Sequence, residues 1–345
     1  MPSDASADLL PDLLSVTEDP LTEAYDLAML DLDGVVYVGP DAVPGAAAHL
    51  AAAREQGMRL AFITNNASRP PSAVAEHLTS LGVAAEPDDV VTSAQAAARV
   101  LLDRLGEGAR VAMLGADGLE QALLEAGLVA VGVADEASAI VTGYAPQMRW
   151  ADLMHGATRI RDGLWWVASN TDLTIPTPYG IAPGHGVLVD TVRRFSGVDP
   201  VVAGKPAQPL LEETIRRVGG TRPLMVGDRL DTDIEGARNA GLHSLLVLTG
   251  VTGLEELIAA RPEERPTYIG VDLRALGEPQ PAPVLEGDEW RLGGWSGSVE
   301  DGRLSLDGEG GAADWWRVAA TTAWHHADAH DSAPSIEGLT PPKAT

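Results

Sequence analysis

The stretch "YDLAMLDLDG", residues 25–34, ends an unbroken apolar run with two acids. The run at 27–30 is typical of a strand buried on both faces of a parallel sheet. Asp31 and Asp33 follow at positions i and i+2, so their carboxylates point to the same side while Leu32 faces the core. Two carboxylates this close raise each other's pKa unless a cation lies between them. The stretch therefore predicts a site for a hard divalent metal or two carboxylates with divided catalytic roles, and a solvated turn is the simpler alternative.

Outward from this stretch, short apolar runs alternate with segments of helical periodicity, which predicts βα units and a mostly parallel sheet. The predicted strands lie at 58–66, 200–206, 223–228 and 243–250, and the predicted helices at 44–57, 70–82, 209–220 and 232–241. We therefore predict an α/β fold whose core domain consists of residues 25–93 and 189–276.

A second αβ block interrupts this core at residues 94–188. Its apolar runs are "ARVAMLG", "SAIVTGY" and "LWWVASNTD", and "DLMHGATRIRDG" has the periodicity of a helix. Because the block stands between two halves of one predicted sheet, it indicates an inserted α/β domain.

The two ends of the chain differ from this pattern. Residues 1–24 are acidic, with no basic start and no long apolar run, so we expect a disordered leader rather than a signal peptide. Residues 277–345 begin with a Pro-rich acidic linker and then hold five of the eight tryptophans. Gly turns predict β-ribbons at 289–308, and the periodicity predicts an amphipathic helix at 313–330. We interpret this extension as a small α+β appendage whose indoles serve stability or assembly, including a homo-oligomer, and expect it to be dispensable for the chemistry because every motif precedes it.

The composition excludes several classes of function. The chain has 345 residues, a formal net charge of −26 and no cysteine. The negative field disfavours nucleic acids and anionic membranes as partners, whereas a small phosphorylated substrate is allowed if a local cation and a metal neutralise it. Disulfides, thiolate metal sites and cysteine nucleophiles are excluded. Since no window offers the roughly 18 uninterrupted apolar residues of a membrane span, we expect a soluble, cytoplasmic protein.

The lysines are unusually few. Lys205 and Lys343 are the only lysines among the 24 basic residues, so Lys205 is the single lysine of the predicted domains. A surface position is the usual interpretation of a lysine, but the other cations of these domains are arginines. A P-loop is excluded because Pro206 follows and no glycine lies five positions earlier. A compact ammonium suits a phosphoryl group flanked by carboxylates, where a guanidinium fork would not fit.

Polar residues also follow two further predicted strands, at the edge where open α/β sheets bind ligands. Thr64, Asn65 and Asn66 offer a hydroxyl, amides and backbone N–H groups that suit phosphoryl oxygens, although an ordinary Asn turn is the preferred interpretation of this stretch taken alone. Asp228 is a candidate ligand for a metal held by Asp31. Asp233 is a candidate to hold a metal-bound water or Lys205.

The order Asp-x-Asp, Thr, Lys and Asp-(four residues)-Asp, each after its own strand, resembles the haloacid dehalogenase-like phosphatases. The stretches "LDLDGVVYVG", "FITNNASRP", "ASNTDLTIPTPYGIAPGHG", "VAGKP" and "VGDRLDTDIEGARNAG" are similar to the p-nitrophenylphosphatase and nucleotidase-type subfamily, which has a large α/β cap between the Thr and Lys motifs. The resemblance covers residues 25–276 and implies a Rossmann-like core with 94–188 as the cap.

The resemblance implies a Mg²⁺-dependent phosphomonoester hydrolase. Asp31 would attack phosphorus and form an aspartyl-phosphate, while Asp33 would act as general acid and then as general base. Mg²⁺ would be held by Asp31, the backbone carbonyl of Asp33 and Asp228, with Asp233 assisting from outside. Thr64 and Lys205 would hold the phosphoryl oxygens, and Asn65 and Asn66 would help to bind substrate.

The details of the motifs and the length of the extension are most similar to the actinobacterial glycerol-3-phosphate phosphatases, which implies glycerol 3-phosphate as substrate. Residues 168–180 offer polar groups, with Asp172 among them, and no evident aromatic pair for stacking a ring. Phosphoglycolate, pyridoxal phosphate, a nucleoside monophosphate and a sugar phosphate stay open as alternatives.

Two other classes of protein also stay open. A receiver-type phosphoacceptor domain uses Asp, Thr and Lys around Mg²⁺, but it has no need of an inserted domain or of Asp33. A catalytically silent scaffold would act through the Trp-rich extension. A phosphatase assay distinguishes an enzyme, which turns over substrate, from both of these classes.

Overall fold

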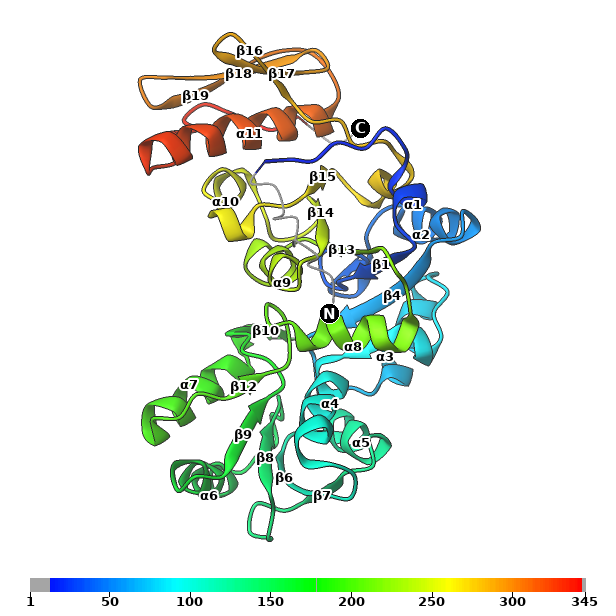
Figure 1. Cartoon of the computed structure of the whole chain (residues 1–345), viewed down its shortest axis with the longest axis vertical. Helices are drawn as coiled ribbons and strands as arrows, with labels where there is room; N and C mark the ends of the chain where they lie inside the picture. The colour runs from blue at the N-terminus through cyan, green and yellow to red at the C-terminus, as the bar shows by residue number, and fades with distance from the viewer. Residues whose placement is uncertain (1–12, 178, 343–345) are drawn as a thin grey trace, which may run out of the picture. The chain divides into compact units, whose positions relative to one another are not determined.

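The computed structural model describes residues 13–177 and 179–342 and divides into two compact units (Figure 1). The first unit contains residues 1–60 and 220–345, and the second contains residues 61–219. Parallel strands and helices build both units, so the predicted α/β fold class is confirmed.

In the first unit, four parallel strands lie in the order β15, β14, β13, β1. Leu30 lies opposite Val226, and Val226 lies opposite Leu245, so the strands end at the same edge of the sheet. The elements of this part are β1 (Leu27–Leu30), β13 (Pro223–Gly227), β14 (His243–Val247), β15 (Tyr268–Gly270), α2 (Ala46–Glu55), α9 (Glu235–Asn239) and α10 (Leu254–Ile258). The strand residues are nearly all buried, as their apolar runs predict.

Short elements connect these strands. After β1 the chain makes a small antiparallel flap, and after β13 a π-helical turn leads into α9, which is shorter than the helix predicted at 232–241. The connecting elements are β2 (Tyr37–Val38), β3 (Asp41–Ala42), the π-helix η2 (Leu230–Ile234) and the 3₁₀ helix η3 (Pro262–Glu264). The helix α1 (Leu21–Ala24) precedes β1, and the 3₁₀ helix η4 (Leu273–Gly277) follows β15.

Residues 13–24 pack against this unit, which differs from the expected disorder of 1–24. Leu14 and Leu21 are buried, and the Ser15 N–H donates to the Thr267 carbonyl oxygen over 3.0 Å. The apolar side chains of this otherwise acidic segment explain its packing. Residues 1–12 lie outside the described part of the chain.

The last elements of the first unit form what we call the C-terminal module, residues 284–330. An antiparallel sheet of β16 (Val284–Glu286), β17 (Glu289–Leu292), β18 (Trp295–Glu300) and β19 (Arg303–Gly308) is followed by α11 (Ala312–His330). A Cβ on Gly297 would lie 2.5 Å from the Thr322 Oγ1, so glycine lets α11 approach the sheet closely. The predicted β-ribbons and helix are both present.

The C-terminal module shares one hydrophobic core with the rest of the first unit. Trp315, Trp316 and Trp324 of α11 are buried together with Leu257 and Ile258 of α10. Figure 1 shows α11 alongside α10 and β15, and contacts between these elements agree with it. The module is therefore an integral layer of this unit.

The second unit holds a five-stranded parallel sheet in the order β12, β9, β8, β6, β7. Its core includes Trp166, whose Nε1–H donates to the Thr142 Oγ1 over 3.0 Å. The elements are β6 (Arg110–Leu114), β7 (Val129–Val131), β8 (Ala139–Thr142), β9 (Trp165–Ala168), β12 (Val201–Val202), α5 (Asp117–Glu125), α6 (Trp150–Arg161), α7 (His185–Ser196) and α8 (Pro209–Val218). An antiparallel hairpin, β10 (Thr174–Thr177) and β11 (Gly180–Pro183), precedes α7.

The same unit also contains β5 and residues 61–64 of β4, which pair in parallel and precede this sheet in the sequence. Phe62 of β4 lies opposite Val90 of β5. The elements are β4 (Arg59–Thr64), α3 (Pro71–Ser80), the 3₁₀ helix η1 (Pro87–Asp89), β5 (Val90–Thr92) and α4 (Ser93–Leu105). The Thr92 side chain caps α4 by accepting the Gln95 N–H.

The two units have other bounds than the predicted domains, whose limits stay a prediction. The second unit begins at residue 61 and ends at 219, whereas the predicted insertion runs from 94 to 188. One reason is β12, which we assigned to the core half: it has only two residues and pairs with β9. A strand this short carries no periodicity that assigns it to one sheet or another.

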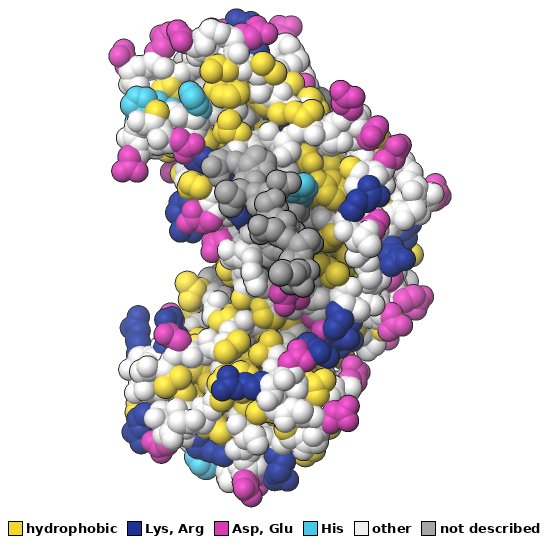
Figure 2. All heavy atoms as spheres, in the orientation of Figure 1, with side chains coloured by type: hydrophobic (Ala, Val, Ile, Leu, Met, Phe, Trp, Pro, Cys, Tyr) yellow, Lys and Arg dark blue, Asp and Glu magenta, His cyan; other side chains and the backbone are white. Residues whose placement is uncertain are grey.

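Two surface properties bear on the predicted partners. On the face in Figure 2, acidic side chains are spread over both units with arginines between them. Within the described residues, no helix is long and apolar enough to cross a bilayer.

Candidate active site

The parallel pairing of β1 and β13 brings two predicted metal ligands together. Asp31 directly follows β1 and Asp228 directly follows β13. Because Leu30 and Val226 are opposite each other, the next residue of each strand emerges at the same edge of the sheet. The Asp31 N–H also donates to the Val226 carbonyl oxygen over 2.9 Å. The two carboxylates therefore meet although 197 positions separate them in the sequence.

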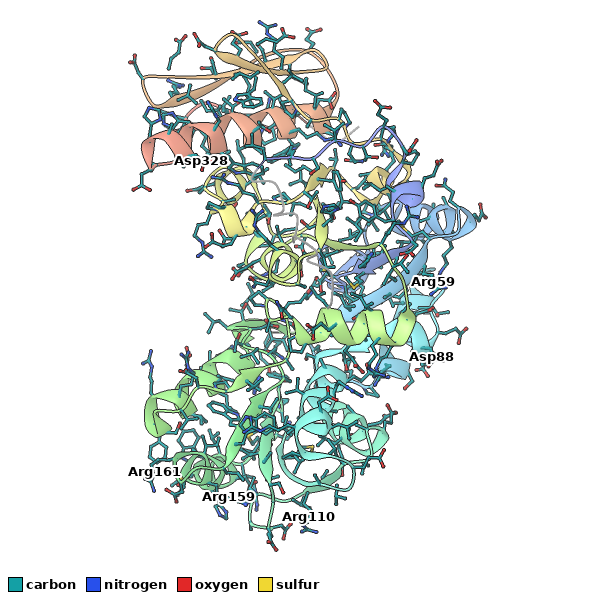
Figure 3. The ribbon with its side chains drawn as sticks, in the orientation of Figure 1. Arg59, Asp88, Arg110, Arg159, Arg161 and Asp328 are labelled. Carbon is teal, nitrogen blue, oxygen red and sulfur yellow. The ribbon has the colours of Figure 1, made fainter. Side chains whose placement is uncertain are left out.

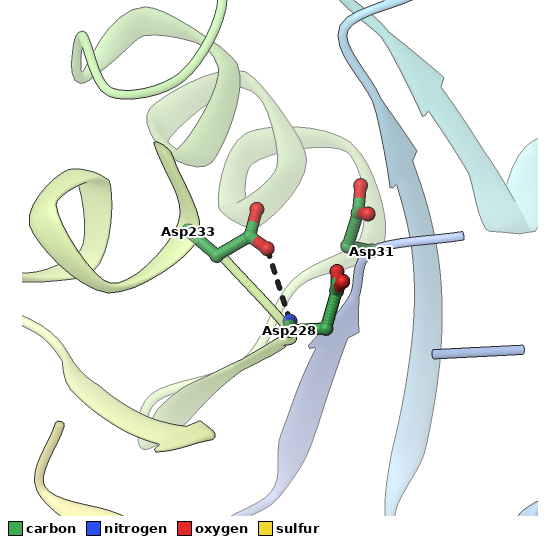
Figure 4. Close-up of side chains that lie close together, drawn as sticks. All are labelled: Asp31, Asp228 and Asp233. Carbon is green, nitrogen blue, oxygen red and sulfur yellow. Dashed lines mark hydrogen bonds between the residues drawn. The ribbon is translucent and has the colours of Figure 1, made fainter. Parts of the chain in front are cut away.

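Asp31, Asp228 and Asp233 form a three-carboxylate cluster (Figure 4). One carboxylate oxygen of each lies within 4.8 Å of the others. Asp228 and Asp233 are 0% and 1% exposed, respectively, and Asp31 is half-buried. Three negative charges this close in a buried place require a compensating cation. Carboxylate oxygens are the ligands that Mg²⁺ prefers, so the donor set fits the metal that the motifs imply.

Glycines leave room for the Asp228 carboxylate. A Cβ on Gly34 would lie 2.3 Å from Asp228 Oδ2, and a Cβ on Gly250 would lie 1.9 Å from the same atom. Gly34 also has a φ of +88°, which favours glycine. Only a residue without a side chain fits at either position.

The loop 249–252 fixes Asp228 by hydrogen bonds. The Val251 N–H donates to Oδ2 over 2.7 Å, and the Thr252 hydroxyl donates to the Asp228 carbonyl oxygen over 2.6 Å. The Thr249 hydroxyl donates to the Gly34 carbonyl oxygen over 2.6 Å and so ties the loop to the chain after Asp33. Sequence reasoning missed this loop, although its "TGVTG" glycines are a signal for a close backbone approach.

Asp233 belongs to the cluster and also binds the backbone at the end of β13. Its Oδ2 accepts the N–H groups of Asp228 (3.2 Å) and Arg229 (3.1 Å). A Cβ on Gly227 would lie 2.2 Å from the Asp233 Cβ, so this approach also depends on glycine. Asp231 is exposed and ion-paired with Arg229 over 2.8 Å, in keeping with a role outside the cluster.

Asp33 lies at the start of the flap, and its side chain is not part of the cluster. Although the residue is exposed, the protein atoms around it keep water from part of its carboxyl, and this desolvation raises the pKa of Asp33. A hydrogen bond from the Gly39 N–H acts in the opposite direction. A carboxyl that holds its proton more firmly than usual is suited to protonating a leaving group.

Thr64 and Asn66, in the second unit, form a compact turn after β4. The Asn66 N–H donates to the Thr64 Oγ1 over 3.1 Å, and the Asn66 Oδ1 accepts the Ser68 N–H over 2.8 Å. The stretch is thus an Asn turn, as the simpler interpretation had it. The same turn fixes the Thr64 hydroxyl, so the two interpretations are compatible.

Asn65 joins three loops of the second unit. Its Oδ1 accepts the Lys205 N–H over 2.8 Å, and its Nδ2 donates to the Lys205 carbonyl oxygen over 3.0 Å. The same Nδ2 donates to Asp172 Oδ1 over 2.9 Å. A Cβ on Gly204 would lie 2.6 Å from Asn65 Oδ1, so glycine permits this contact. The described hydrogen bonds give Asn65 the geometry of a residue that positions Lys205, and its predicted substrate contact stays a prediction.

Lys205 itself is 2% exposed. The surface interpretation of this lysine is therefore wrong. An ammonium is almost never buried unless anionic groups compensate it. Burial agrees with the reasoning from composition, in which this position needs a compact ammonium.

His185 supports the loop that carries Asp172. The ring is 3% exposed and its Nδ1 lies 2.8 Å from the Asn170 carbonyl oxygen. Burial lowers the pKa of His185 to about 4, so the ring is neutral near pH 7. A Cβ on Gly186 would lie 2.1 Å from the Thr171 carbonyl oxygen, which keeps the loop close to α7. Sequence reasoning missed this histidine, although glycines on both sides of it in "PGHGV" signal tight packing.

The fold and the carboxylate cluster define a class of protein, and comparison with known sequences agrees. The family described as haloacid dehalogenase-like hydrolase matches residues 28–129, and a second model of this family matches residues 202–276. D-glycerol 3-phosphate phosphatase of Mycobacterium tuberculosis is 44% identical over 257 residues, which are 74% of this chain and 72% of that protein. The chain therefore belongs to the haloacid dehalogenase-like hydrolases. Acid sugar phosphatase of Staphylococcus aureus is 34% identical over 252 residues, which are 72% of this chain and 95% of that protein.

Solved structures resemble the whole chain as well. The glycerol phosphate phosphatase of Mycobacterium tuberculosis in complex with magnesium has a TM-score of 0.81 at 41% identity, covering 89% of this chain and 92% of that one. Its complex with calcium has a TM-score of 0.82 at 39% identity and covers 94% of both chains. The 4-nitrophenylphosphatase of Thermotoga maritima has a TM-score of 0.69 at 30% identity, covering 74% of this chain and 98% of that one.

Proposed function

We propose that this chain is a Mg²⁺-dependent phosphatase that hydrolyses glycerol 3-phosphate to glycerol and phosphate. The observation that carries the proposal is the cluster of Asp31, Asp228 and Asp233 at the ends of two neighbouring parallel strands. The relatives described above are phosphatases, and one solved relative contains magnesium. These facts support the activity and the metal together.

The chemistry follows from two carboxyl groups of the first unit. An Asp31 oxygen attacks phosphorus, the bond from phosphorus to the ester oxygen breaks, and the leaving alkoxide takes the proton of Asp33. Asp33, now a carboxylate, then removes a proton from water, whose oxygen attacks the aspartyl-phosphate. The bond between phosphorus and Asp31 breaks, which regenerates Asp31 and releases phosphate. The raised pKa of Asp33 supports its first role.

Asp31, the backbone carbonyl of Asp33 and Asp228 would hold Mg²⁺, which supplies positive charge against the phosphoryl oxygens. Asp233 would orient this arrangement through the backbone of Asp228. Thr64 and Lys205, fixed in the second unit by the turn after β4 and by Asn65, would hold the remaining phosphoryl oxygens. Positioning and charge neutralisation then supply most of the rate acceleration.

The substrate assignment has its own support. The relative that is 44% identical is named for D-glycerol 3-phosphate. Residues 169–174, "SNTDLT", contain hydroxyl, amide and carboxylate side chains, the kinds of group that suit the hydroxyl groups of a polyol. Since the proposed substrate is a small phosphorylated metabolite, we also propose a cytoplasmic location.

A substrate panel tests the proposal. We would measure kcat/KM for glycerol 3-phosphate, phosphoglycolate, pyridoxal phosphate and a nucleoside monophosphate, with Mg²⁺ and with a chelator. Glycerol 3-phosphate should lead, and Asp31→Asn should be inactive because it loses the nucleophile's charge at unchanged volume. A tenfold lead by another substrate, about 1.4 kcal/mol of transition-state discrimination, removes the substrate assignment only. Hydrolysis of none above the Asp31→Asn background removes the phosphatase assignment.

A further inference from the structure

The loop that holds Asp228 continues directly into α10. Val251 and Thr252 bind Asp228, and Gly253 then begins the helix, its N–H donating to Glu256 over 3.1 Å. The helix has only five residues, Leu254–Ile258. A helix of this length has no stability of its own in water, so tertiary contacts must hold it in place.

Part of these contacts comes from α11, the last helix in the described part of the chain. The buried side chains of α10, Leu254, Leu257 and Ile258, lie in one core with the tryptophans of α11. Trp324 is 0% exposed, and its Nε1–H donates to the Leu257 carbonyl oxygen over 2.8 Å. The same carbonyl also accepts the Ala260 N–H over 3.3 Å, just after the helix ends. Trp324 thus supplies α10 with apolar contact and with a second, shorter hydrogen bond at its end.

A second connection joins α11 to the segment after α10. Asp328 of α11, labelled in Figure 3, forms a bidentate ion pair with the Arg265 guanidinium at 2.6 and 2.8 Å. The Arg265 side chain is 2% exposed and its guanidinium carbon lies 5.5 Å from the ring centre of Trp324. The pair lowers the pKa of Asp328, which keeps the carboxylate charged. Leu257, inside the segment 253–265, and Arg265, at its end, are therefore both held by α11.

The same core also supports the other side of the carboxylate cluster. Leu230 and Ile234 stand on either side of Asp231 and Asp233 in the π-helical turn. They are 7% and 0% exposed and belong to the core that contains Trp324. The π-helical turn 230–234 and the loop 249–252, which both fix Asp228, therefore adjoin a core that α11 completes.

We propose that α11 positions the Asp228 carboxylate for metal binding, with Trp324 as the positioning residue. This rests on the proposed Mg²⁺ site. It replaces our expectation that the extension is dispensable for the chemistry, because its removal would expose the core on which α10 and the loop 249–252 depend.

The experiment compares two Trp→Phe substitutions in the full chain. Trp324→Phe keeps most of the ring but removes the hydrogen bond to the α10 carbonyl. Trp290→Phe is the matched control: Trp290 lies in the same module, packs edge-on against His325 at 5.6 Å, and its Nε1–H has no hydrogen-bond partner among the described residues. The readouts are amide hydrogen exchange at Val251 and Thr252 and the Kd for Mg²⁺ by calorimetry, neither of which requires turnover.

Trp324→Phe should speed exchange at both amides at least tenfold and weaken Mg²⁺ binding at least tenfold, and Trp290→Phe should change neither. Unchanged exchange or unchanged Mg²⁺ affinity in Trp324→Phe overturns the proposal, as does an equal change in Trp290→Phe. If the wild-type chain proves not to be a phosphatase, the exchange and metal readouts still decide whether α11 positions Asp228.

Discussion

Gly250→Ala adds one methyl group where the backbone comes nearest to Asp228. The new Cβ would lie 1.9 Å from Asp228 Oδ2 and 2.5 Å from its Cγ, whereas ordinary contacts begin at 3.4 Å. To lengthen the 1.9 Å distance to an ordinary contact of 3.4 Å, either the carboxylate or the loop must move by about 1.5 Å. Gly250 does not have a positive φ, so backbone strain does not complicate the result.

The size of the effect follows from this displacement. Misplacing a catalytic group by about 1 Å costs roughly 100-fold in rate, and the moved carboxylate also loses the Val251 N–H. We therefore expect kcat/KM to fall by roughly 100-fold, or about 2.7 kcal/mol of transition-state stabilisation. Because Asp228 belongs to the metal cluster, raising the Mg²⁺ concentration should restore part of the activity.

Gly277→Ala is the matched control, since a Cβ there meets nothing within 4 Å and the residue has no positive φ. Both variants and the wild type would be assayed with 4-nitrophenyl phosphate over a range of Mg²⁺ concentrations, with circular dichroism to confirm folding. A folded Gly250→Ala variant with kcat/KM within threefold of Gly277→Ala would refute the idea that this glycine makes room for a metal ligand.

Four further predictions concern other parts of the site. Asp33→Asn should leave phosphorylation of Asp31 slow but possible, so mass spectrometry with 4-nitrophenyl phosphate should find a phospho-enzyme; failure to trap any contradicts the division of roles. Lys205→Arg should lower kcat/KM at least tenfold although the charge is kept, because the wide guanidinium fork does not fit between phosphoryl oxygens and carboxylates as a compact ammonium does, and a near-wild-type value contradicts this. Asn65→Ala should reduce the free energy of unfolding by about 1–3 kcal/mol, since it leaves the buried Lys205 N–H without its acceptor; urea titration measures this, and an unchanged midpoint counts against it. Burial lowers the pKa of His185 from 6.5 to about 4, so between these pH values only the unfolded chain binds a proton at this ring. The contribution of the neutral ring to the free energy of unfolding should therefore be full above pH 6.5 and decrease by about 3 kcal/mol towards pH 4. His185→Gln should remove this decrease from the pH profile of stability.

Much of the carboxylate cluster could be predicted from the sequence, because its geometry follows from local patterns. The apolar run at 27–30 predicts a buried strand, and so does the run before Asp228. Neighbouring parallel strands end at the same edge of a sheet, so acids that directly follow them come together regardless of the length of the chain between them. Asp31 and Asp228 were found in this way, whereas Asp233 was found from the start of the helix predicted at 232–241.

Contacts between distant segments could not be predicted. "TGVTG" at 249–253 shows that the backbone bends or approaches something closely, but nothing in it points to Asp228. Asn65 appeared suited to bind a phosphoryl group, and only the folded chain shows its amide on the backbone of Lys205. The partners of such side chains are set by tertiary packing, which leaves no periodic pattern in the sequence.

The discontinuity of the first unit has a consequence for how the protein is made. The strand that carries Asp31 leaves the ribosome early, but its partner β13 begins only at residue 223 and α11 only at residue 312. Closing a loop of this length by an unfolded chain costs entropy that grows with the logarithm of its length, and prior folding of residues 61–219 shortens the flexible part. Even then, the core beneath Asp228 stays incomplete until the final helix has been synthesised. On the proposed role of α11, a nascent or truncated chain that lacks residues 312–330 would lack a finished metal site, and its activity would have to wait for this helix.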